Sequence, residues 1–305
     1  MNTKAFVAAA LAACMIAAPA SASFIPNYST DFDSFALGTI NGQDGWSANR
    51  ASSPPWDEAI VSLGGGNNVW RISNQVNSGT FSDQPFAPRP GGIPTVTTTL
   101  AGVTNGNPQE FAGQSSTGAQ HRTFFAEFDF KSATDTPQDG ARITISPDNG
   151  NGGRQAFAAL RDTGTGVAID TFDVDAGGGF SSAVTIGTVS YGAFHTLRIE
   201  IDFNDGIFDD VARYFLDDAL VHTDKSWESF YTNFQAASHP LGVPVQTLLF
   251  RLSSAPVDNV AGGGFYIDNV AFGFIPEPGT LAVFGLGLLG LAALRRRDAH
   301  GATPA

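Results

Sequence analysis

The chain has 305 residues, with 29 Asp and Glu against 16 Lys and Arg, which gives a formal net charge of −13 at pH 7. Such an acidic chain repels the phosphates of a nucleic acid, so the composition excludes a nucleic-acid partner. Cys14 is the only cysteine. An intrachain disulfide and a thiolate metal site are therefore excluded, and the stability of the fold has to come from burial of apolar side chains.

The first 22 residues have the layout of a secretory signal peptide. A short positive region precedes an apolar stretch from Ala5 to Ala18, and Ala20-Ser21-Ala22 supplies the small residues that signal peptidase needs after Sec export. The mature chain is therefore expected to begin near Ser23. Residues 11–14 also fit a lipoprotein box, in which Cys14 would be lipidated, and this alternative stays open.

Short apolar runs with a period of two fill residues 23–275, separated by clusters of Gly, Pro, Asn and Asp. In the run 195–203, for example, Leu197, Ile199 and Ile201 share one face while polar side chains share the other. The pattern predicts strands at 29–32, 59–63, 68–73, 124–130, 142–146, 155–161, 167–172, 195–203, 211–216, 219–222, 245–253 and 265–272. It predicts loops with a few short edge strands from 81 to 118, and no helix.

A dozen strands with one apolar face each predict an all-β domain over residues 23–275. Two antiparallel sheets packed face to face, as a β-sandwich or jelly roll, bury every apolar face at once. The 25 Phe residues of the chain are enough to fill such a core. A hairpin is expected at Asp217-Asp218, because Asp tolerates the positive φ of a tight turn.

Four segments resemble the strands of concanavalin A-like and laminin G-like sandwiches: residues 195–202, the hairpin 211–221, Ser226-Trp227-Glu228, and the closing strand Phe265 to Val270. The resemblance implies a jelly roll of the kind that hosts lectins, carbohydrate-binding modules and glycoside hydrolases. Because one fold serves all these functions, it does not select among them. We expect a structural or adhesive protein that binds extracellular polysaccharide, with a ligand-free matrix component as the alternative.

One acidic loop is a candidate Ca²⁺ site. Five oxygen-bearing side chains crowd around a glycine there: Asp202, Asn204, Asp205, Asp209 and Asp210. Calcium takes six to eight oxygen ligands from compact loops, so this set could hold the ion. The alternative is a solvated acidic hairpin turn.

Glu200 and Asp202 raise an enzymatic alternative. Strand alternation places both on one face, which resembles the nucleophile and supporting carboxylate of laminarinase-like jelly-roll glycosidases. The general acid of that pattern is a Glu, whereas this chain has Asn204. We therefore expect no enzymatic activity, and a glycoside hydrolase using Glu200 and Asp202 remains the alternative.

Two loop segments pair an aromatic ring with a carboxylate, as sugar-binding sites do. A pyranose can stack on the ring while the carboxylate accepts hydrogen bonds from its hydroxyls. The candidates are Trp56 with Asp57, and Trp227 with Glu228 and Tyr231. The alternative is that these tryptophans are core residues, as most tryptophans are.

Three unlike elements follow one another at the C-terminal end. They are Pro276-Glu277-Pro278, an apolar run from Leu281 to Leu294, and the cluster Arg295, Arg296 and Arg297. As a helix, the apolar run reaches about 21 Å, which is short of the roughly 30 Å hydrocarbon core of a membrane. The run is therefore expected to act as a recognition signal more than as an ordinary anchor.

This arrangement resembles the PEP-CTERM sorting signal of Gram-negative bacteria over residues 276–298, with 299–305 as a tail. The resemblance implies an exosortase partner, transient anchoring in the inner membrane through the helix 281–294, and delivery to the cell surface or extracellular matrix. The alternative is a permanent C-terminal anchor whose Arg297 end stays in the cytoplasm.

Overall fold

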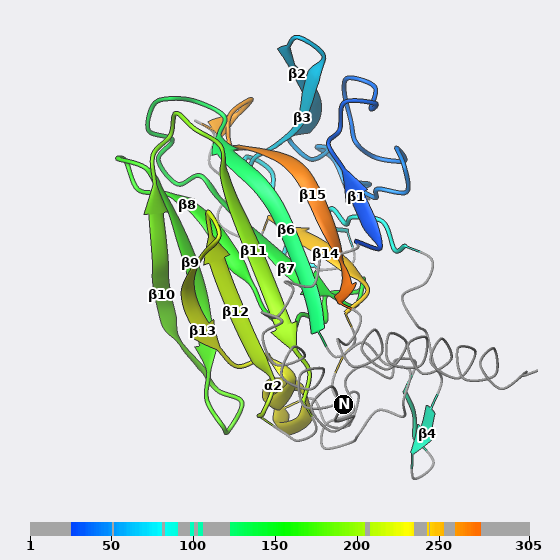
Figure 1. The fold of residues 1–305 in the computed structure, drawn as a ribbon. Coiled ribbons are helices and arrows are strands. Elements are labelled where there is room, and N and C mark those ends of the chain that lie inside the picture. The colour runs from blue at the N-terminus through cyan, green and yellow to red at the C-terminus, as the bar shows by residue number, and fades with distance from the viewer. Residues whose placement is uncertain are drawn as a thin grey trace, which may run out of the picture. The chain divides into compact units, whose positions relative to one another are not determined.

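Two antiparallel sheets pack face to face in the part of the chain that the computed structural model describes (Figure 1). The described residues are 26–50, 52–80, 83–90, 98–100, 103–105, 123–204, 208–234, 243, 245–252 and 260–275. All of them belong to one unit, Pro26–Glu277. The predicted signal peptide, the sorting segment 276–298 with its helix 281–294, the tail 299–305 and Asp205 lie outside the described residues.

The larger sheet has eight strands in the order β13-β12-β11-β6-β15-β3-β2, with β1 paired to β15. These strands are β1 (Tyr28–Thr30), β2 (Glu58–Gly64), β3 (Asn67–Ile72), β6 (Thr123–Ser132), β11 (His195–Asp202), β12 (Val211–Leu216), β13 (Ala219–Asp224) and β15 (Phe265–Ile275). The last strand therefore lies inside the sheet, between β6 and β3. Its partner β1 comes from the other end of the described chain, with Tyr28 opposite Phe272.

The smaller sheet has five strands in the order β10-β9-β8-β7-β14. They are β7 (Arg142–Asp148), β8 (Ala158–Asp162), β9 (Val167–Val174), β10 (Phe180–Val189) and β14 (Thr247–Arg251). A separate pair is formed by β4 (Thr98–Leu100) and β5 (Val103–Asn105). The predicted all-β sandwich is confirmed. Within the described residues, no helix is long and apolar enough to cross a membrane.

The prediction that the domain contains no helix is wrong, because α2 spans Glu228–Phe234. Its first turn is held by Ser226, whose Oγ accepts a hydrogen bond from the N–H of Glu228 at 3.2 Å. Seven residues are too few to show a helical period in the sequence. Strand β10 was not predicted either, since its mostly exposed side chains show no apolar alternation.

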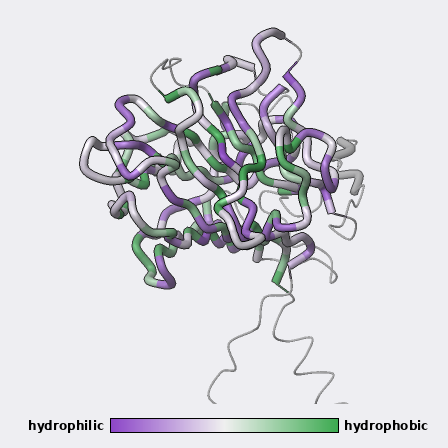
Figure 2. The backbone as a smooth tube through the Cα atoms, turned by 90° about the horizontal axis from the view of Figure 1, so that it is seen from above, coloured by the Kyte–Doolittle hydropathy of each residue, from purple (hydrophilic) through white to green (hydrophobic). Residues whose placement is uncertain are grey.

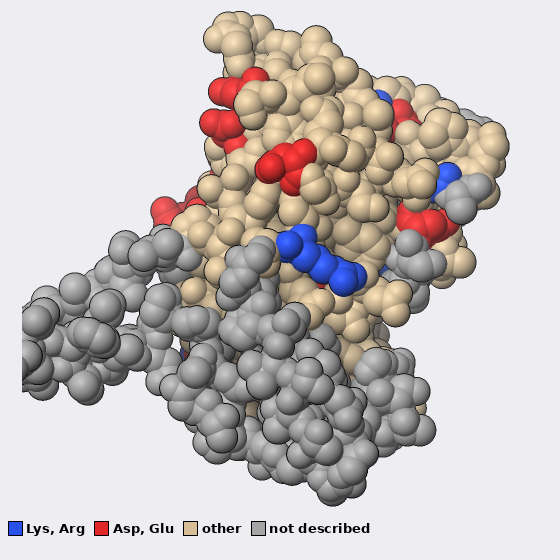
Figure 3. Space-filling view, turned by 90° about the vertical axis from the view of Figure 1, so that its right-hand side faces the viewer, with Lys and Arg blue, Asp and Glu red and all other residues tan. Residues whose placement is uncertain are grey.

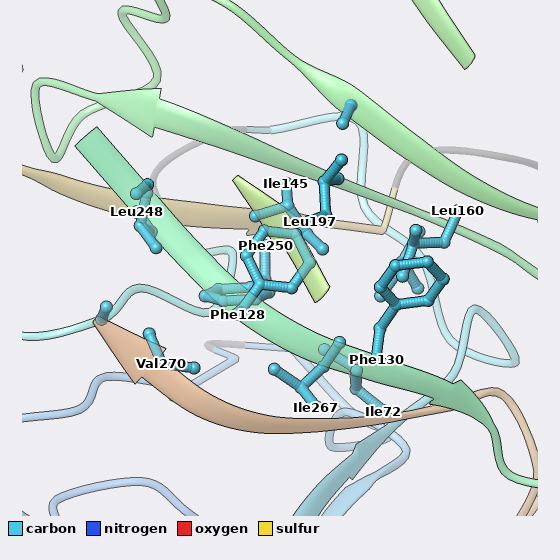
Figure 4. Close-up of a cluster of buried hydrophobic side chains, with 14 of the residues drawn as sticks. Ile72, Phe128, Phe130, Ile145, Leu160, Leu197, Leu248, Phe250, Ile267 and Val270 are labelled. Atoms are coloured by element: carbon cyan, nitrogen blue, oxygen red, sulfur yellow. The ribbon is translucent and has the colours of Figure 1, made fainter. Parts of the chain in front are cut away.

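The core lies between the two sheets, where the apolar face of each strand meets the other layer. Hydrophilic and hydrophobic residues accordingly alternate along the strands (Figure 2). In Figure 4, Phe128, Phe130 and Ile267 of the larger sheet approach Ile145 and Phe250 of the smaller one. The aromatic centre of this core joins Phe250 to Trp70 at 4.8 Å and to Trp46 at 5.6 Å between ring centroids.

The predicted hairpin at Asp217-Asp218 is confirmed, with φ of 49° and 65° at the two residues. It joins β12 to β13, and Leu216 lies opposite Ala219. The carboxylate of Asp217 accepts a hydrogen bond from the backbone N–H of Thr196 at 3.0 Å, which ties the turn to β11. Two aspartates at positive φ are compatible with the twist that a two-residue hairpin requires.

Gly264 is predicted to be irreplaceable at the start of β15. Its φ is +83°, and an added Cβ would lie 2.2 Å from the carbonyl oxygen of Ile72. Gly264→Ala is therefore expected to lower the free energy of unfolding by about 2 kcal/mol or more. Gly262→Ala is the matched control, because Gly262 has a φ of +70° with nothing within 4 Å. Equal losses in denaturant unfolding of the two variants would contradict the clash.

Candidate functional site

The two carboxylates of the enzymatic alternative lie on the outer face of the larger sheet, where each forms an ion pair with an arginine. Arg198 donates to Glu200 at 3.0 Å, and Arg213 donates to Asp202 at 2.6 Å. Burial raises the pKa of Glu200, and Arg198 acts against that effect. Asn204 donates to the carbonyl oxygen of Asp209 at 2.9 Å. Both carboxylates therefore belong to ion pairs, and the third position carries no acid.

The described members of the predicted calcium set are also bound to protein groups. Asp202 is paired with Arg213, while the carboxylate of Asp210 accepts hydrogen bonds from the N–H of Asn204 at 2.8 Å and the Oγ of Ser226 at 2.6 Å. Asp205 lies outside the described residues. Among the residues that the structure describes, no group of three His, Cys, Asp or Glu is arranged to hold a metal ion. The calcium site therefore stays a prediction, and in this structure Asp202 and Asp210 have protein partners.

Asp210 and Glu228 instead form a buried carboxyl pair at the start of α2. Each is only 2% exposed. Burial raises the pKa of Asp210 to about 6, and burial together with the neighbouring Asp210 and Asp209 raises the pKa of Glu228 to about 9. Both causes favour the protonated form of Glu228, whose carboxyl group is buried at the first turn of the helix.

The predicted sugar-stacking rings of Trp227 and Tyr231 are buried. Trp227 is 4% exposed and packs against Phe157 at 5.7 Å and Phe180 at 4.6 Å between centroids. The hydroxyl of Tyr231 accepts a hydrogen bond from the backbone N–H of Arg154 at 2.6 Å. Because α2 folds its apolar residues onto the smaller sheet, these rings form a second hydrophobic cluster and offer no free face to a sugar.

Trp56 and Asp57 have structural partners as well. Trp56 is 5% exposed, its Nε1 donates to the carbonyl oxygen of Asp83 at 2.9 Å, and the guanidinium of Arg50 lies 5.1 Å from its ring centroid. Asp57 accepts hydrogen bonds from Arg71 at 2.7 Å and from Ser73. In both candidate segments, the aromatic ring that was expected to stack on a sugar is buried in the protein.

The outer face of the smaller sheet gathers several arginines of this acidic chain. The inner side chains of the smaller sheet, such as Ile143, Ile145 and Leu160, fill the core. Strand alternation therefore turns Arg142 of β7, Arg161 of β8 and Arg251 of β14 to the outer side. Arg154 joins them from the β7–β8 connection, because it lies 4.6 Å from the ring of Trp227 in the outer cluster. We call this set, Arg142, Arg154, Arg161 and Arg251, the arginine face.

Strand register brings these arginines together. Arg142 and Arg161 are direct cross-strand partners. Arg251 lies opposite Thr144, two residues along β7 from Arg142 and on the same side. Burial and the charge of Arg251 lower the pKa of Arg154 to about 10, although Tyr231 and Asp148 act against them. The four guanidinium groups thus lie within electrostatic reach of one another.

Two carboxylates border the arginine face. Burial acts to raise the pKa of Asp170, but hydrogen bonds from Arg161 and Thr185 outweigh it and hold that pKa below its ordinary value. Arg161 and Asp170 are 2.7 Å apart. Asp148 is fully buried, accepts hydrogen bonds from three loop N–H groups, and has a pKa raised by burial to about 7. Burial thus weakens the negative charge of Asp148, whereas Asp170 stays ionised beside Arg161.

The sequence contained a signal for this face that was not used. Each arginine on a strand alternates with core residues, so its outward direction could be predicted. The four residues are spread from 142 to 251, however, and only the register of β14, β7 and β8 makes them neighbours. Figure 3 shows how sparse charged side chains are on one face of the described part.

Comparisons with known proteins give a sorting motif and several distant structural likenesses. No curated protein matches the chain. Similar solved structures include galectin LEC-6 of Caenorhabditis elegans, with 10% identity and a TM-score of 0.29 over 61% of this chain and 93% of the galectin. The endo-beta-1,4-glucuronan lyase of the fungus Trichoderma reesei has 14% identity and a TM-score of 0.37, over 82% of this chain and 96% of the lyase. Alginate lyase Aly36B has 14% identity and a TM-score of 0.41, over 82% of this chain and 97% of the lyase.

These likenesses are too distant to support an argument about function. A family model described as the PEP-CTERM protein-sorting motif matches residues 274–297, which include the Pro-Glu-Pro segment and the arginine cluster. The motif indicates an exported protein that a sorting system recognises at its C-terminal segment. The chain therefore carries a PEP-CTERM sorting motif whose match begins in the final two residues of the last strand of a β-sandwich.

Proposed function

We propose that this exported sandwich binds an acidic polysaccharide through the arginine face and acts as an adhesive protein at the cell surface or in the extracellular matrix. An exosortase-type protease would process its C-terminal segment after Sec export. The sorting motif supports the location, and the arginine face supports the chemistry of the ligand. The arginine face replaces the aromatic loop segments as the site that we assign to a glycan.

The observation that carries this proposal is the pairing of Arg142 with Arg161 in an acidic chain. Like charges directly opposite one another destabilise a sheet unless an opposite charge compensates them, and here Asp170 pairs with Arg161. Four of the chain's 16 basic residues nevertheless lie on this one face, in a protein with a net charge of −13. Guanidinium groups bind carboxylates with two parallel hydrogen bonds, which suits the uronate groups of an acidic glycan.

The double variant Arg142→Gln/Arg251→Gln is expected to weaken binding of polygalacturonate by about 10-fold or more. A hydrogen bond to a charged group is worth about 1.5–3 kcal/mol, and about 1.4 kcal/mol is tenfold in affinity. Titration calorimetry of the mature protein measures the dissociation constant. Binding of neutral dextran should be absent in both proteins.

The matched control is Arg198→Gln/Arg213→Gln, which removes two arginines from the outer face of the other sheet. It should leave polygalacturonate affinity within about twofold of the parent protein. Equal weakening by both double variants would show a response to net charge alone. Absence of binding by the parent protein would favour the ligand-free matrix component.

A further inference from the structure

The edge of the smaller sheet at β10 is open. In Figure 1 this strand forms the left-hand border of the sandwich, and β9 is its one neighbour in the sheet. Within the described residues, its backbone–backbone hydrogen bonds all go to β9. Six of the ten residues from Phe180 to Val189 are exposed, and Phe180 itself is 41% exposed. The opposite side of this strand therefore presents free N–H and C=O groups to solvent.

Loop segments cover two of the other sheet edges in the described part of the chain. Beside β14, the N–H of Phe250 donates to Pro85 O at 2.9 Å and the N–H of Ala87 donates to Leu248 O at 3.0 Å. Beside β2, Gly38 and Ile60 exchange two hydrogen bonds of 3.0 and 2.6 Å. The edge strand β13 carries the charged Asp224. Covering segments and charges are the usual means by which proteins block edge-to-edge pairing.

β10 lacks a charge of its own. Its sequence, Phe-Ser-Ser-Ala-Val-Thr-Ile-Gly-Thr-Val, contains no Asp, Glu, Lys, Arg or Pro. Two register shifts against β9 interrupt the strand, between Phe180 and Ala183 and between Thr185 and Gly187. These irregularities limit regular pairing to the runs 183–185 and 187–189, which lie on either side of Ile186.

Symmetry and charge together select the partner. A second copy of this chain carries the same net charge of −13, so two copies repel at most surfaces. An uncharged strand paired antiparallel with itself brings no like charges together. A two-fold axis between Thr185 and Ile186 places Ala183 of one copy opposite Thr188 of the other, both on the outer side of the sheet, as an isologous interface requires.

We propose that β10 is a self-association edge, at which two copies of this protein join their smaller sheets by antiparallel pairing of β10 with β10. The joined sheet has ten strands, with the two β10 strands at its centre. This inference does not depend on a glycan ligand.

Charge reversal across the two-fold axis tests the pairing. Ala183 and Thr188 are exposed, and both lie on the outer side of the sheet, opposite Phe172 and Ala168 of β9. In Ala183→Lys/Thr188→Lys and in Ala183→Glu/Thr188→Glu, like charges face each other across the axis. Sedimentation velocity of the full mature protein should show a dimer for the parent, and a dissociation constant raised about 10-fold or more in each variant.

Mixing the two variants should restore the dimer, because Lys then faces Glu. This rescue also shows that both variants are folded. The control Ala219→Lys/Thr223→Lys places the same charges on exposed positions of β13 and should leave the dimer unchanged. A monomeric parent protein, or a dimer that neither β10 variant weakens, would overturn the proposal. Failure of the mixture to recover the dimer would do so as well.

Discussion

Replacing Phe250 by alanine is expected to lower the free energy of unfolding by about 3–5 kcal/mol, the usual range for a fully buried phenylalanine. Phe250 has no exposed surface, and its ring packs against both Trp46 and Trp70, which also contact each other in the core. Two indole rings held from different segments cannot collapse into the space it leaves. Urea unfolding followed by tryptophan fluorescence measures the loss.

Phe234→Ala is the matched control for Phe250→Ala, because it removes the same ring from a position that is 64% exposed. Its effect is expected to stay within about 0.5 kcal/mol, as for surface substitutions in general. A loss at Phe250 no larger than the loss at Phe234 would mean that the two sheets do not pack around this ring.

Replacing Glu228 by glutamine is expected to stabilise the fold in alkaline solution by an amount on the order of 3 kcal/mol at pH 8. The pKa of Glu228 is about 9 in the folded protein, above its ordinary value of 4.5. Between these two values the folded chain keeps a proton that the unfolded chain loses. The stability present below pH 4.5 is therefore lost as pH rises towards 9, whereas glutamine cannot ionise and keeps it.

Thermal unfolding of the parent and of Glu228→Gln from pH 4 to pH 9 measures this difference. The two melting temperatures should converge near pH 4 and separate progressively above it. Glu127→Gln is the control, since this carboxylate is 37% exposed and pairs with Arg198 on the sheet surface. Its effect is expected to stay below about 1 kcal/mol. A constant offset between parent and Glu228→Gln at every pH would contradict a retained proton.

Much of the fold could be predicted from sequence because most strands have one dry and one wet face. The strict alternation of residues 195–203 and the aromatic alternation of 124–130 correspond to β11 and β6. β10 and α2 escaped this rule for opposite reasons. β10 lies at an edge, where most of its side chains meet solvent, and α2 is too short to show a period although Trp227 and Tyr231 bury their rings beside it.

The candidate site was far less predictable than the fold. Trp227 and Trp56 stood beside carboxylates in apparent loops, and their burial depends on packing against Phe157 and Arg50 from other segments. The arginine face depends on register, because a one-residue slip between β7 and β8 would separate Arg142 from Arg161. Alternation along one strand predicts which face of the sheet a side chain lies on. It does not predict which residue of the neighbouring strand lies beside it.

The interior position of β15 sets the order of events during export. β3, β6 and β1 all pair with β15, so none of these pairings can form before residues 265–275 are available. Pairings between distant segments form late, so the larger sheet stays open while most of the chain has already crossed the membrane. The sorting motif begins at residue 274. The segment that completes the sheet and the segment that the sorting system recognises thus emerge together, and the domain finishes folding only when its destination signal becomes available.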